Sequence, residues 1–443
     1  MKRVLFSVAC LLIYAFINEP KFTHFAKSDR SALFSSNKKE DKLVYPLLVD
    51  TFYIMNEGKL FWYKTDTSAI SLREQLVAII DTTGYYGLIS KAYHVAELKS
   101  ILQENFSDSQ LMYEADRIYT DAAIAVFKDI YQGYNMKPWV GFDQVSAKYA
   151  MADDEFLLQL LLNAPSSVKL KNAVEMLEPA DAAYASLKKE LYRQKERNRK
   201  DSVASLLLSM NYYRWIHHFK FDRFIVVNLA AARLQYYEDD SLLLQMKTVL
   251  GKSSTPTPRF SAWCDQVILY PYWYVPKSII FNEYMPILKK NPSWLDAHNM
   301  QVVDASGKVL DHHGLDWSSF HSGYFPYSIR QSTGCDNALG VIKFNINTPY
   351  GVYLHDTNNK TAFFSASRYY SHGCIRLEDP IGLGSRLLGN KLDTTYLQSC
   401  FKKQKPVYRQ LDKPVPVFVV YMRAQTDTKG KVVYFRDVYR LMK

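Results

Sequence analysis

The sequence predicts an α+β protein with a helical N-terminal half, a mostly β C-terminal domain and an insertion that caps the second domain. Apolar residues recur at helical spacing before Phe224, and short β-rich runs bounded by turn residues follow it. The chain has 443 residues, of which 48% are apolar, so two or three domains with hydrophobic cores are expected.

The helical half should contain at least four helices. Ser71 and Glu74 form a capping-box pattern before an apolar stripe, and Gly84 is a typical helix stop. The later helices are expected at Tyr113–Tyr131, at Glu155–Leu162, and after Pro179, where Leu187 and Leu191 make the inner stripe.

The β half should begin with a hairpin. Phe224–Val227 and Arg233–Tyr237 read as strands, and residues 238–241 supply a turn before a return strand at Leu242–Leu250. The later strands are expected at Gln266–Tyr274, Gly340–Ile346, Val352–His355, Val415–Met422 and Val432–Phe435, with a turn at Thr426–Gly430 between the last two.

These patterns divide the chain into four parts. A signal peptide or anchor is expected at residues 1–20, a helical domain at 21–205, a connecting helix at 206–222 and the β-rich domain at 223–443. Within the last part, residues 281–327 are rich in Pro, Trp, His and Gly, so they are interpreted as a lid or capping insertion.

The N-terminus is typical of an exported protein. Lys2 and Arg3 precede an apolar run from Val4 to Ile17, which has secretory length. No small-x-small cleavage site follows, so an uncleaved membrane anchor remains an alternative, whereas Cys10 lies too early for a lipoprotein signal.

The formal charge of +11 includes a basic helical stretch at Lys188–Lys200. No nucleic-acid module accompanies it, so we expect no nucleic-acid partner.

Four cysteines follow the leader, namely Cys264, Cys335, Cys374 and Cys400. A nucleophilic cysteine must remain free, so at most one disulfide is expected among Cys264, Cys335 and Cys400 if Cys374 reacts.

The residues with the clearest chemistry are His355-Asp356 and Ser371-His372-Gly373-Cys374-Ile375-Arg376. A thiol becomes a strong nucleophile as its thiolate, and a nearby imidazole can take the proton. Gly373 permits a tight turn and the approach of a substrate carbonyl, while backbone N–H groups at such a turn can bind an oxyanion.

The same residue types also permit a zinc site. His355, His372 and Cys374 are possible zinc ligands, and three protein ligands suffice for a catalytic metal. Four further histidines of the insertion region fit no recognisable ligand spacing: His298, His312, His313 and His321.

The pattern H-x15-S-H-G-C-I-R resembles the motif of YkuD-type L,D-transpeptidases. Several other segments resemble the same family: Phe224–Asn228 with Leu250-Gly251-Lys252, Asn337–Gly340, Lys343-Phe344 and Tyr353–Thr357. The helical half, including Thr120-Asp121-Ala122 and Leu177-Glu178-Pro179, is similar to the scaffold domain of large periplasmic members. Two features depart from those relatives: no peptidoglycan-binding insert precedes the stretch Asp201–Trp215, and Thr333–Asp336 replaces a Pro-Gly-Pro.

The resemblance implies a role for each motif residue. Cys374 would be the nucleophile and His355 its general base, oriented by Asp356. His372 and the backbone around Gly373 would help to bind the oxyanion. Ser371, Tyr353 and Arg376 would contact substrate, with Arg376 as an anchor for a carboxylate or for the loop.

The implied reaction is 3→3 cross-linking of peptidoglycan stem peptides through a cysteinyl thioester, without metal or cofactor. Carbapenems are then expected to acylate Cys374. The expected location is the periplasm of a Gram-negative bacterium, secreted or anchored to the inner membrane. Carboxypeptidase activity, D-amino-acid exchange, a zinc hydrolase and a non-catalytic wall-binding scaffold remain as alternatives.

Overall fold

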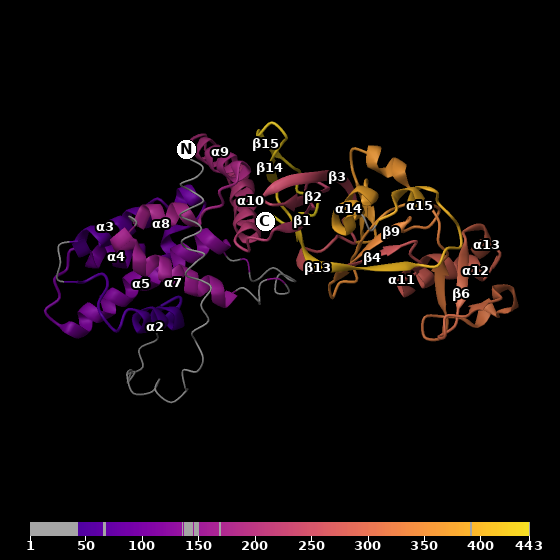
Figure 1. The fold of residues 1–443 in the computed structure, drawn as a ribbon, viewed down its shortest axis with the longest axis horizontal. Coiled ribbons are helices and arrows are strands. Elements are labelled where there is room, and N and C mark those ends of the chain that lie inside the picture. The colour runs from indigo at the N-terminus through magenta and orange to yellow at the C-terminus, as the bar shows by residue number, and fades with distance from the viewer. Residues whose placement is uncertain are drawn as a thin grey trace, which may run out of the picture. The chain divides into compact units, whose positions relative to one another are not determined.

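The computed structural model describes residues 43–64, 68–134, 136, 145, 150–167, 170–389 and 392–442 (Figure 1). The N-terminal leader predicted from the sequence lies outside these residues. None of the helices that the structure describes combines the length and apolar character needed to cross a membrane. As predicted, helices come first and a mostly β region follows.

The helices of the first half are α2 (Pro46–Met55), α3 (Ser68–Asp81), α4 (Val95–Ile101), α5 (Ser109–Gln132), α7 (Ala150–Ser167), α8 (Leu170–Leu177), α9 (Ala182–Glu196) and α10 (Lys200–His217). Short 3₁₀ turns at Thr83–Tyr86 and Ser90–Ala92 join α3 to α4. The predicted stripe of α9 is confirmed, because Leu187 and Leu191 are both fully buried.

Two helix starts differ from the sequence prediction. The capping box at Ser71 is wrong, because α3 already begins at Ser68 and Ser71 lies inside it. Helix α9 begins at Ala182, and the Asp181 side chain rather than Pro179 marks its start by accepting from the N–H groups of Ala183 and Tyr184.

A buried aspartate fixes the segment after α2 to the long helix α5. The carboxylate of Asp116 accepts hydrogen bonds from the backbone N–H groups of Phe61, Trp62 and Tyr63. It also accepts one from the Tyr53 hydroxyl. Because several donors satisfy it, this carboxylate can be buried without an unpaired acceptor.

The β region is built on nine strands that pair in the order β11-β3-β12-β10-β9-β4-β13-β1-β2, and β2 also pairs with β3. The strands are β1 (Arg223–Asn228), β2 (Arg233–Glu238), β3 (Ser241–Gly251), β4 (Phe260–Leu269), β9 (Ile342–Asn347), β10 (Leu354–His355), β11 (Tyr369–Ser371), β12 (Ile375–Leu377) and β13 (Val407–Val420). The β2–β3 pair therefore closes the sheet on itself. Helices α14 (Pro380–Leu388) and α15 (Thr394–Gln398) follow β12.

The insertion forms a subdomain with its own sheet and core. Its strands, in the order β5-β8-β6-β7, are β5 (Trp273–Tyr274), β6 (Met300–Val303), β7 (Val309–Leu310) and β8 (Ser328–Gln331). Its helices are α11 (Lys277–Ile279), a π-helix η3 (Ile280–Tyr284), α12 (Met285–Leu288) and α13 (Trp294–Ala297), with 3₁₀ turns η4 (His312–Gly314) and η5 (Trp317–Ser319). A separate hydrophobic cluster extends from Val275 to Ile329. We call residues 273–331 the capping subdomain.

Two strand predictions are corrected. The run Gln266–Tyr274 is not one strand: β4 ends at Leu269, and Tyr270, at φ +48°, precedes a break before β5 of the other sheet. The turn after Thr426 does not join β13 to the last strand. Instead it joins β14 (Ala424–Thr426) to β15 (Val432–Tyr434).

Candidate active site

The Ser-His-Gly-Cys motif forms a loop between β11 and β12. The Ser371 hydroxyl donates to the Cys374 carbonyl at 2.7 Å and accepts from the Gly373 N–H at 3.1 Å. On the other side, the Thr257 hydroxyl donates to the Gly373 carbonyl at 2.8 Å. Gly373 has φ +121°, which side chains rarely adopt, and a Cβ there would meet no atom within 4 Å. The loop is therefore fixed by its neighbours but open above Gly373.

Cys374 is a free, partly exposed thiol. The backbone N–H and the phenol of Tyr353 lie close to its sulfur, and the Trp273 side chain of the capping subdomain lies close to the same phenol. Burial raises the pKa of the Cys374 thiol above its usual value, although the Tyr353 contacts and the nearby Lys343 and Arg376 charges act to lower it.

His355 is buried at the end of β10, with 4% of its surface exposed. Its Nδ1 bonds to the backbone carbonyl of Asp356. A carbonyl only accepts, so Nδ1 carries the proton and Nε2 of the neutral ring keeps a free lone pair. Burial lowers the pKa of His355 to about 3, and the Arg376 charge contributes. The ring is thus a neutral base at ordinary pH.

The backbone carbonyl of Asp356 bonds to the His355 ring, while the Asp356 carboxylate has other partners. That carboxylate accepts from the N–H groups of Val341 at 3.0 Å and Thr357 at 2.7 Å, and it pairs with Lys360. Gly340 makes room for it, because a Cβ there would lie 2.1 Å from Asp356 Oδ2. The carboxylate therefore holds the strand end from which His355 projects.

Two cations lie in one row with His355. The strand register sets His355 opposite Lys343 of β9 and opposite Arg376 of β12. Residues opposite each other on paired strands point to the same face of a sheet, so the three side chains share a face. Burial lowers the pKa of Lys343, whose Nζ lies 4.1 Å from the Tyr353 ring centroid. Burial also lowers the pKa of Arg376. This row can attract an anionic group.

His372 points to the capping subdomain rather than to the thiol. Its Nε2 lies 3.2 Å from Oε1 of Glu283, which belongs to the π-helix η3, and both side chains are about half exposed (49% and 50%). In the described part of the chain, neither His355 nor His372 is hydrogen-bonded to the Cys374 sulfur. The motif residues therefore lie around one loop, and the thiol lies beside Tyr353.

Three further residues at this site were not predicted from the sequence: Lys343 as a site residue, Glu283 and Trp273. A lysine or glutamate in isolation carries no signal of function. Only the register of β9 and β10 brings Lys343 beside His355, and only the folded capping subdomain brings Trp273 and Glu283 to the motif.

The histidines considered as zinc ligands do not extend the motif. Among the described residues, the one group of three donors that converge is Asp296, His312 and His313 in the capping subdomain. The rings of His312 and His313 share the Asp296 Oδ2, at 3.2 and 3.1 Å. His355, His372 and Cys374 do not converge in this way, so the described geometry does not favour a zinc site at the motif.

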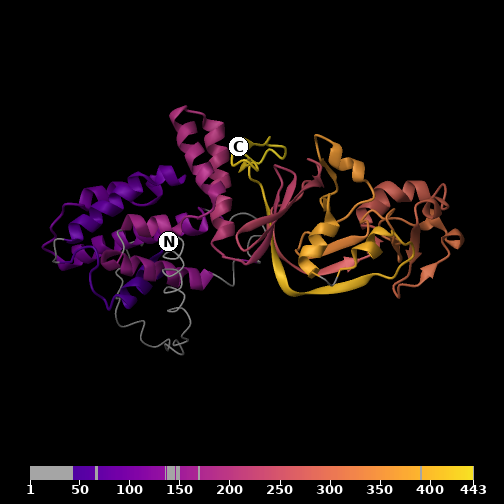
Figure 2. The same cartoon turned by 45° about the horizontal axis from the view of Figure 1, so that its top comes forward.

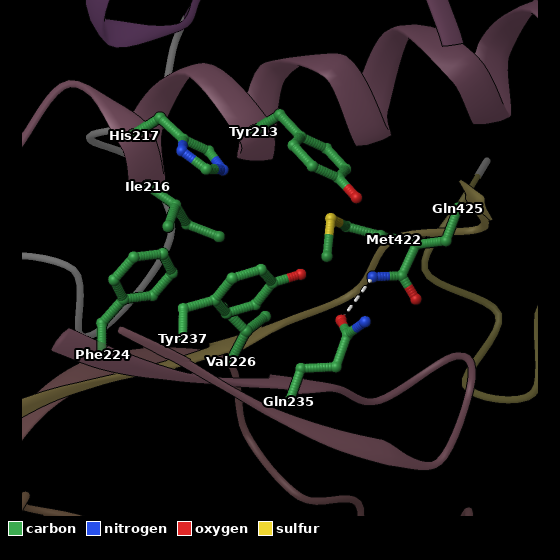
Figure 3. Close-up of a pocket in the computed structure, with 9 residues that line it drawn as sticks. All are labelled: Tyr213, Ile216, His217, Phe224, Val226, Gln235, Tyr237, Met422 and Gln425. Carbon is green, nitrogen blue, oxygen red and sulfur yellow. Dashed lines mark hydrogen bonds between the residues drawn. The ribbon is translucent and has the colours of Figure 1, made fainter. Parts of the chain in front are cut away.

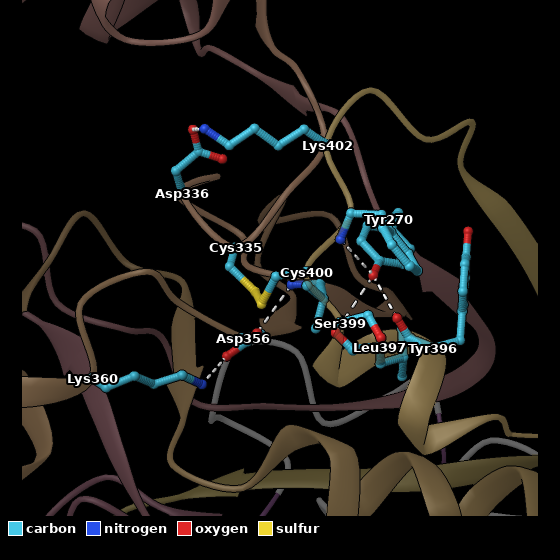
Figure 4. The surroundings of a disulfide bond; sticks show 12 residues. Tyr270, Cys335, Asp336, Asp356, Lys360, Tyr396, Leu397, Ser399, Cys400 and Lys402 are labelled. Carbon is cyan, nitrogen blue, oxygen red and sulfur yellow. Dashed lines mark hydrogen bonds and ion pairs between the residues drawn. A yellow bond between two sulfur atoms is a disulfide. The ribbon is translucent and has the colours of Figure 1, made fainter.

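A disulfide joins Cys335 to Cys400 (Figure 4). Cys264 is buried and free. The bond closes a loop of the chain with a sequence separation of 65, which contains every predicted motif residue from Tyr353 to Arg376. Cys335 is therefore unavailable as an alternative nucleophile, while Cys374 is free.

One cavity is lined by residues that are distant in the sequence from the Ser-His-Gly-Cys motif. It is lined mainly by aromatic and aliphatic side chains of α10, β1 and β2, including Tyr213, Phe224 and Tyr237, and by a Gln425–Gln235 hydrogen bond of 3.0 Å (Figure 3). None of the motif residues lines it. It therefore belongs to the packing of α10 on the sheet rather than to the candidate site.

Comparisons with known proteins match both halves of the chain. The model of the L,D-transpeptidase catalytic domain (YkuD) matches residues 222–407, and that of a scaffold domain matches residues 48–191. A putative L,D-transpeptidase from Haemophilus influenzae is 33% identical over 241 residues, which cover 54% of this chain and 49% of that protein. The chain thus matches about half the length of this relative.

Solved structures are similar at lower identity. They include an L,D-transpeptidase from Mycobacterium smegmatis, 16% identical, covering 45% of this chain and 58% of that chain, with a TM-score of 0.22. The catalytic domain of an E. faecium L,D-transpeptidase acylated by ertapenem is 17% identical. The match covers 45% of this chain and 96% of that chain, with a TM-score of 0.23. Scores this low support no inference of their own.

Proposed function

We propose that this chain is an exported enzyme of the L,D-transpeptidase family, which its two domain matches support, and that it forms 3→3 peptidoglycan cross-links through a thioester on Cys374. The observation that supports this most is the site itself: a free thiol lies on an open glycine loop, in a chain segment that also supplies a neutral, oriented imidazole.

In the first step, the Cys374 sulfur attacks the carbonyl that precedes the terminal D-amino acid of a donor tetrapeptide. The thiol proton passes to Nε2 of His355 and then to the departing amine, so protons balance. Catalytic hydrogen bonds often tighten only with substrate bound, and the sulfur must turn from Tyr353 toward His355 for this transfer.

The surroundings of the thiol suit the charges that develop. The backbone N–H of Cys374 donates no hydrogen bond within the described chain, whereas that of Gly373 is engaged by Ser371. The Cys374 N–H is therefore the better donor for the oxyanion, with the Tyr353 hydroxyl nearby. Arg376 and Lys343 offer positive charge to the carboxylate of the leaving D-amino acid.

In the second step, an amine of another stem attacks the thioester and forms the cross-link. Water or a free D-amino acid as acceptor would give a carboxypeptidase or an exchange enzyme with the same site. The apolar leader at Val4–Ile17 favours export to the periplasm or anchoring at the inner membrane.

Incubation with a purified disaccharide-tetrapeptide, followed by mass spectrometry, tests the proposal. We expect a cross-linked dimer and a released D-amino acid, and no product from Cys374→Ala, whose circular dichroism and unfolding transition should match those of the wild type. A carbapenem should add to the wild type and not to this variant. Turnover by Cys374→Ala near the wild-type rate would show that another nucleophile acts.

A further inference from the structure

The capping subdomain contacts the candidate site at two points. Trp273 lies close to the Tyr353 hydroxyl, which in turn lies beside the thiol, and Glu283 contacts His372. Glu283 lies on the π-helix η3, which follows α11 and precedes α12 in the chain. Single π-turns inside helices occur frequently at functional sites.

The acidic groups around the motif differ in how fully they are neutralised. Asp356 is buried, accepts two backbone N–H groups and pairs with Lys360. Glu378, which follows β12, accepts from the N–H and the ammonium of Lys247. Within the part of the chain that the structure describes, Glu283 pairs with the His372 ring alone, and it is half exposed. It is therefore the carboxylate at this site that can still receive a cation.

Charge is thus divided across the site. Lys343 and Arg376 supply positive charge beside His355, whereas Glu283 supplies negative charge beside His372. A donor that carries a carboxylate suits the first region. An acceptor that carries an ammonium group is repelled there and attracted by the second, because complementary charge steers a ligand to its subsite.

From this division we infer that Glu283 and His372 form the acceptor subsite and bind the primary ammonium group of the acceptor. This rests on the proposed function. The ammonium first loses a proton to solvent. The free amine then attacks the thioester carbonyl, the nitrogen–carbon bond forms as the carbon–sulfur bond breaks, and His355 carries the second amine proton to the departing sulfur.

The test compares Glu283→Gln with the wild-type full-length chain in two separate readouts. Acylation is followed as formation of the carbapenem adduct, and transfer as the ratio of cross-linked to hydrolysed product from a disaccharide-tetrapeptide. We expect Glu283→Gln to raise the acceptor KM and to lower the transfer ratio roughly three- to tenfold, since one charge-assisted contact is lost. The acylation rate should stay within about twofold of the wild-type rate, because the activation free energy of that step should change little. Glu283→Asp should restore part of the transfer.

Asp304→Asn provides a charge-matched control in the same subdomain, because Asp304 is partly exposed and its carboxylate accepts hydrogen bonds within its own turn, from Ser306 and Lys308. It should change neither readout. An equal fall of acylation and transfer in Glu283→Gln would show that Glu283 merely orients the motif and would overturn the subsite. An unchanged transfer ratio would overturn it as well. A wild type that carbapenem does not acylate overturns the proposed function, and the subsite with it.

Discussion

At the residue scale, burial acts on the thiol and the imidazole in the same sense. It disfavours the thiolate, which raises the pKa of Cys374, and it disfavours the imidazolium, which lowers the pKa of His355 to about 3. Both shifts favour the neutral pair over the ion pair. The thiol is therefore expected to react by transferring its proton during attack rather than as a preformed thiolate.

A neutral thiol beside a neutral imidazole predicts the pH dependence of Cys374 alkylation by iodoacetamide. Above the pKa of His355 the ring stays neutral, so the rate should rise continuously from about pH 5 to about pH 9 as the thiolate fraction grows. Mass spectrometry of the labelled protein gives the rate. A plateau already reached below about pH 6 would contradict the prediction, because it indicates a stable thiolate–imidazolium pair.

The labelling has an internal control. Cys264 is fully buried, and burial raises its pKa to about 12, while Cys335 and Cys400 are paired. Cys374→Ala should therefore take up almost no label in the native state, and label on Cys264 should appear only after denaturation.

The sequence could predict the motif residues, but not all of their partners. The His355 and Cys374 pair follows from local pattern and resemblance, and the backbone contact of His355 with Asp356 agrees with the orienting role expected of Asp356. The pairing of His372 with Glu283 could not be foreseen, since residues separated by a folded insertion meet only through its packing. The roles of these residues stay predictions.

At the element scale, Gly340 fixes the strand end that carries His355. Its φ is +58°, and a Cβ would lie 2.1 Å from Asp356 Oδ2. Gly351 has a similar φ of +62° but nothing within 4 Å of a Cβ, so it is a matched control. We expect Gly351→Ala to lower the free energy of unfolding by about 1–2 kcal/mol, the usual cost of this backbone conformation.

Gly340→Ala should cost more, roughly 3 kcal/mol or above, because the clash with Asp356 adds to the backbone strain. It should also slow acylation, since Asp356 and His355 must shift. Urea unfolding and carbapenem acylation measure the two effects. Equal losses in both glycine variants would contradict a specific role for the Gly340–Asp356 contact.

The disulfide should stabilise the β region by restricting its unfolded state. For a loop closed over a separation of 65, chain entropy gives about 4 kcal/mol, and measured values are commonly smaller. The free energy of unfolding of the double variant Cys335→Ala/Cys400→Ala should therefore be about 2–4 kcal/mol lower than that of the wild type. Reductant should bring the wild type to the same value and leave the variant unchanged. A reductant effect on the variant would point to another cause.

Strand positions were predictable where the pattern is local and failed where pairing is long-range. Alternation found β1, β2 and β3 and the turn after Thr426. It could not show that β13 pairs in parallel with β1, or that the last strand pairs with β14, because those partners depend on the closed sheet. The small sheet of the capping subdomain was hidden for the same reason, since two of its strands are only two residues long.

At the scale of the whole molecule, the C-terminal segment 423–442 connects the helices to the motif loop. It lies beyond the catalytic-domain match that ends at residue 407. The Ala424 N–H donates to the Ser209 hydroxyl of α10 at 3.0 Å, and Arg423 pairs with Asp201 at 3.2 Å. Farther along, the Tyr439 hydroxyl donates to the Gly251 carbonyl at 2.6 Å.

Tyr439 is thereby linked to the motif. The Gly251 N–H donates to the Thr257 hydroxyl at 3.0 Å, and that hydroxyl donates to the Gly373 carbonyl at 2.8 Å. Tyr439→Phe removes one end of this chain of hydrogen bonds, so we expect a loss of about 1 kcal/mol in unfolding free energy and a slower acylation of Cys374. Tyr408→Phe, at an exposed tyrosine of β13, should change neither. A shift of Gly373 should move the neighbouring Cys374 sulfur and so change the acylation rate. If Tyr439→Phe loses stability but is acylated at the wild-type rate, the C-terminal segment stabilises the fold without positioning the motif loop.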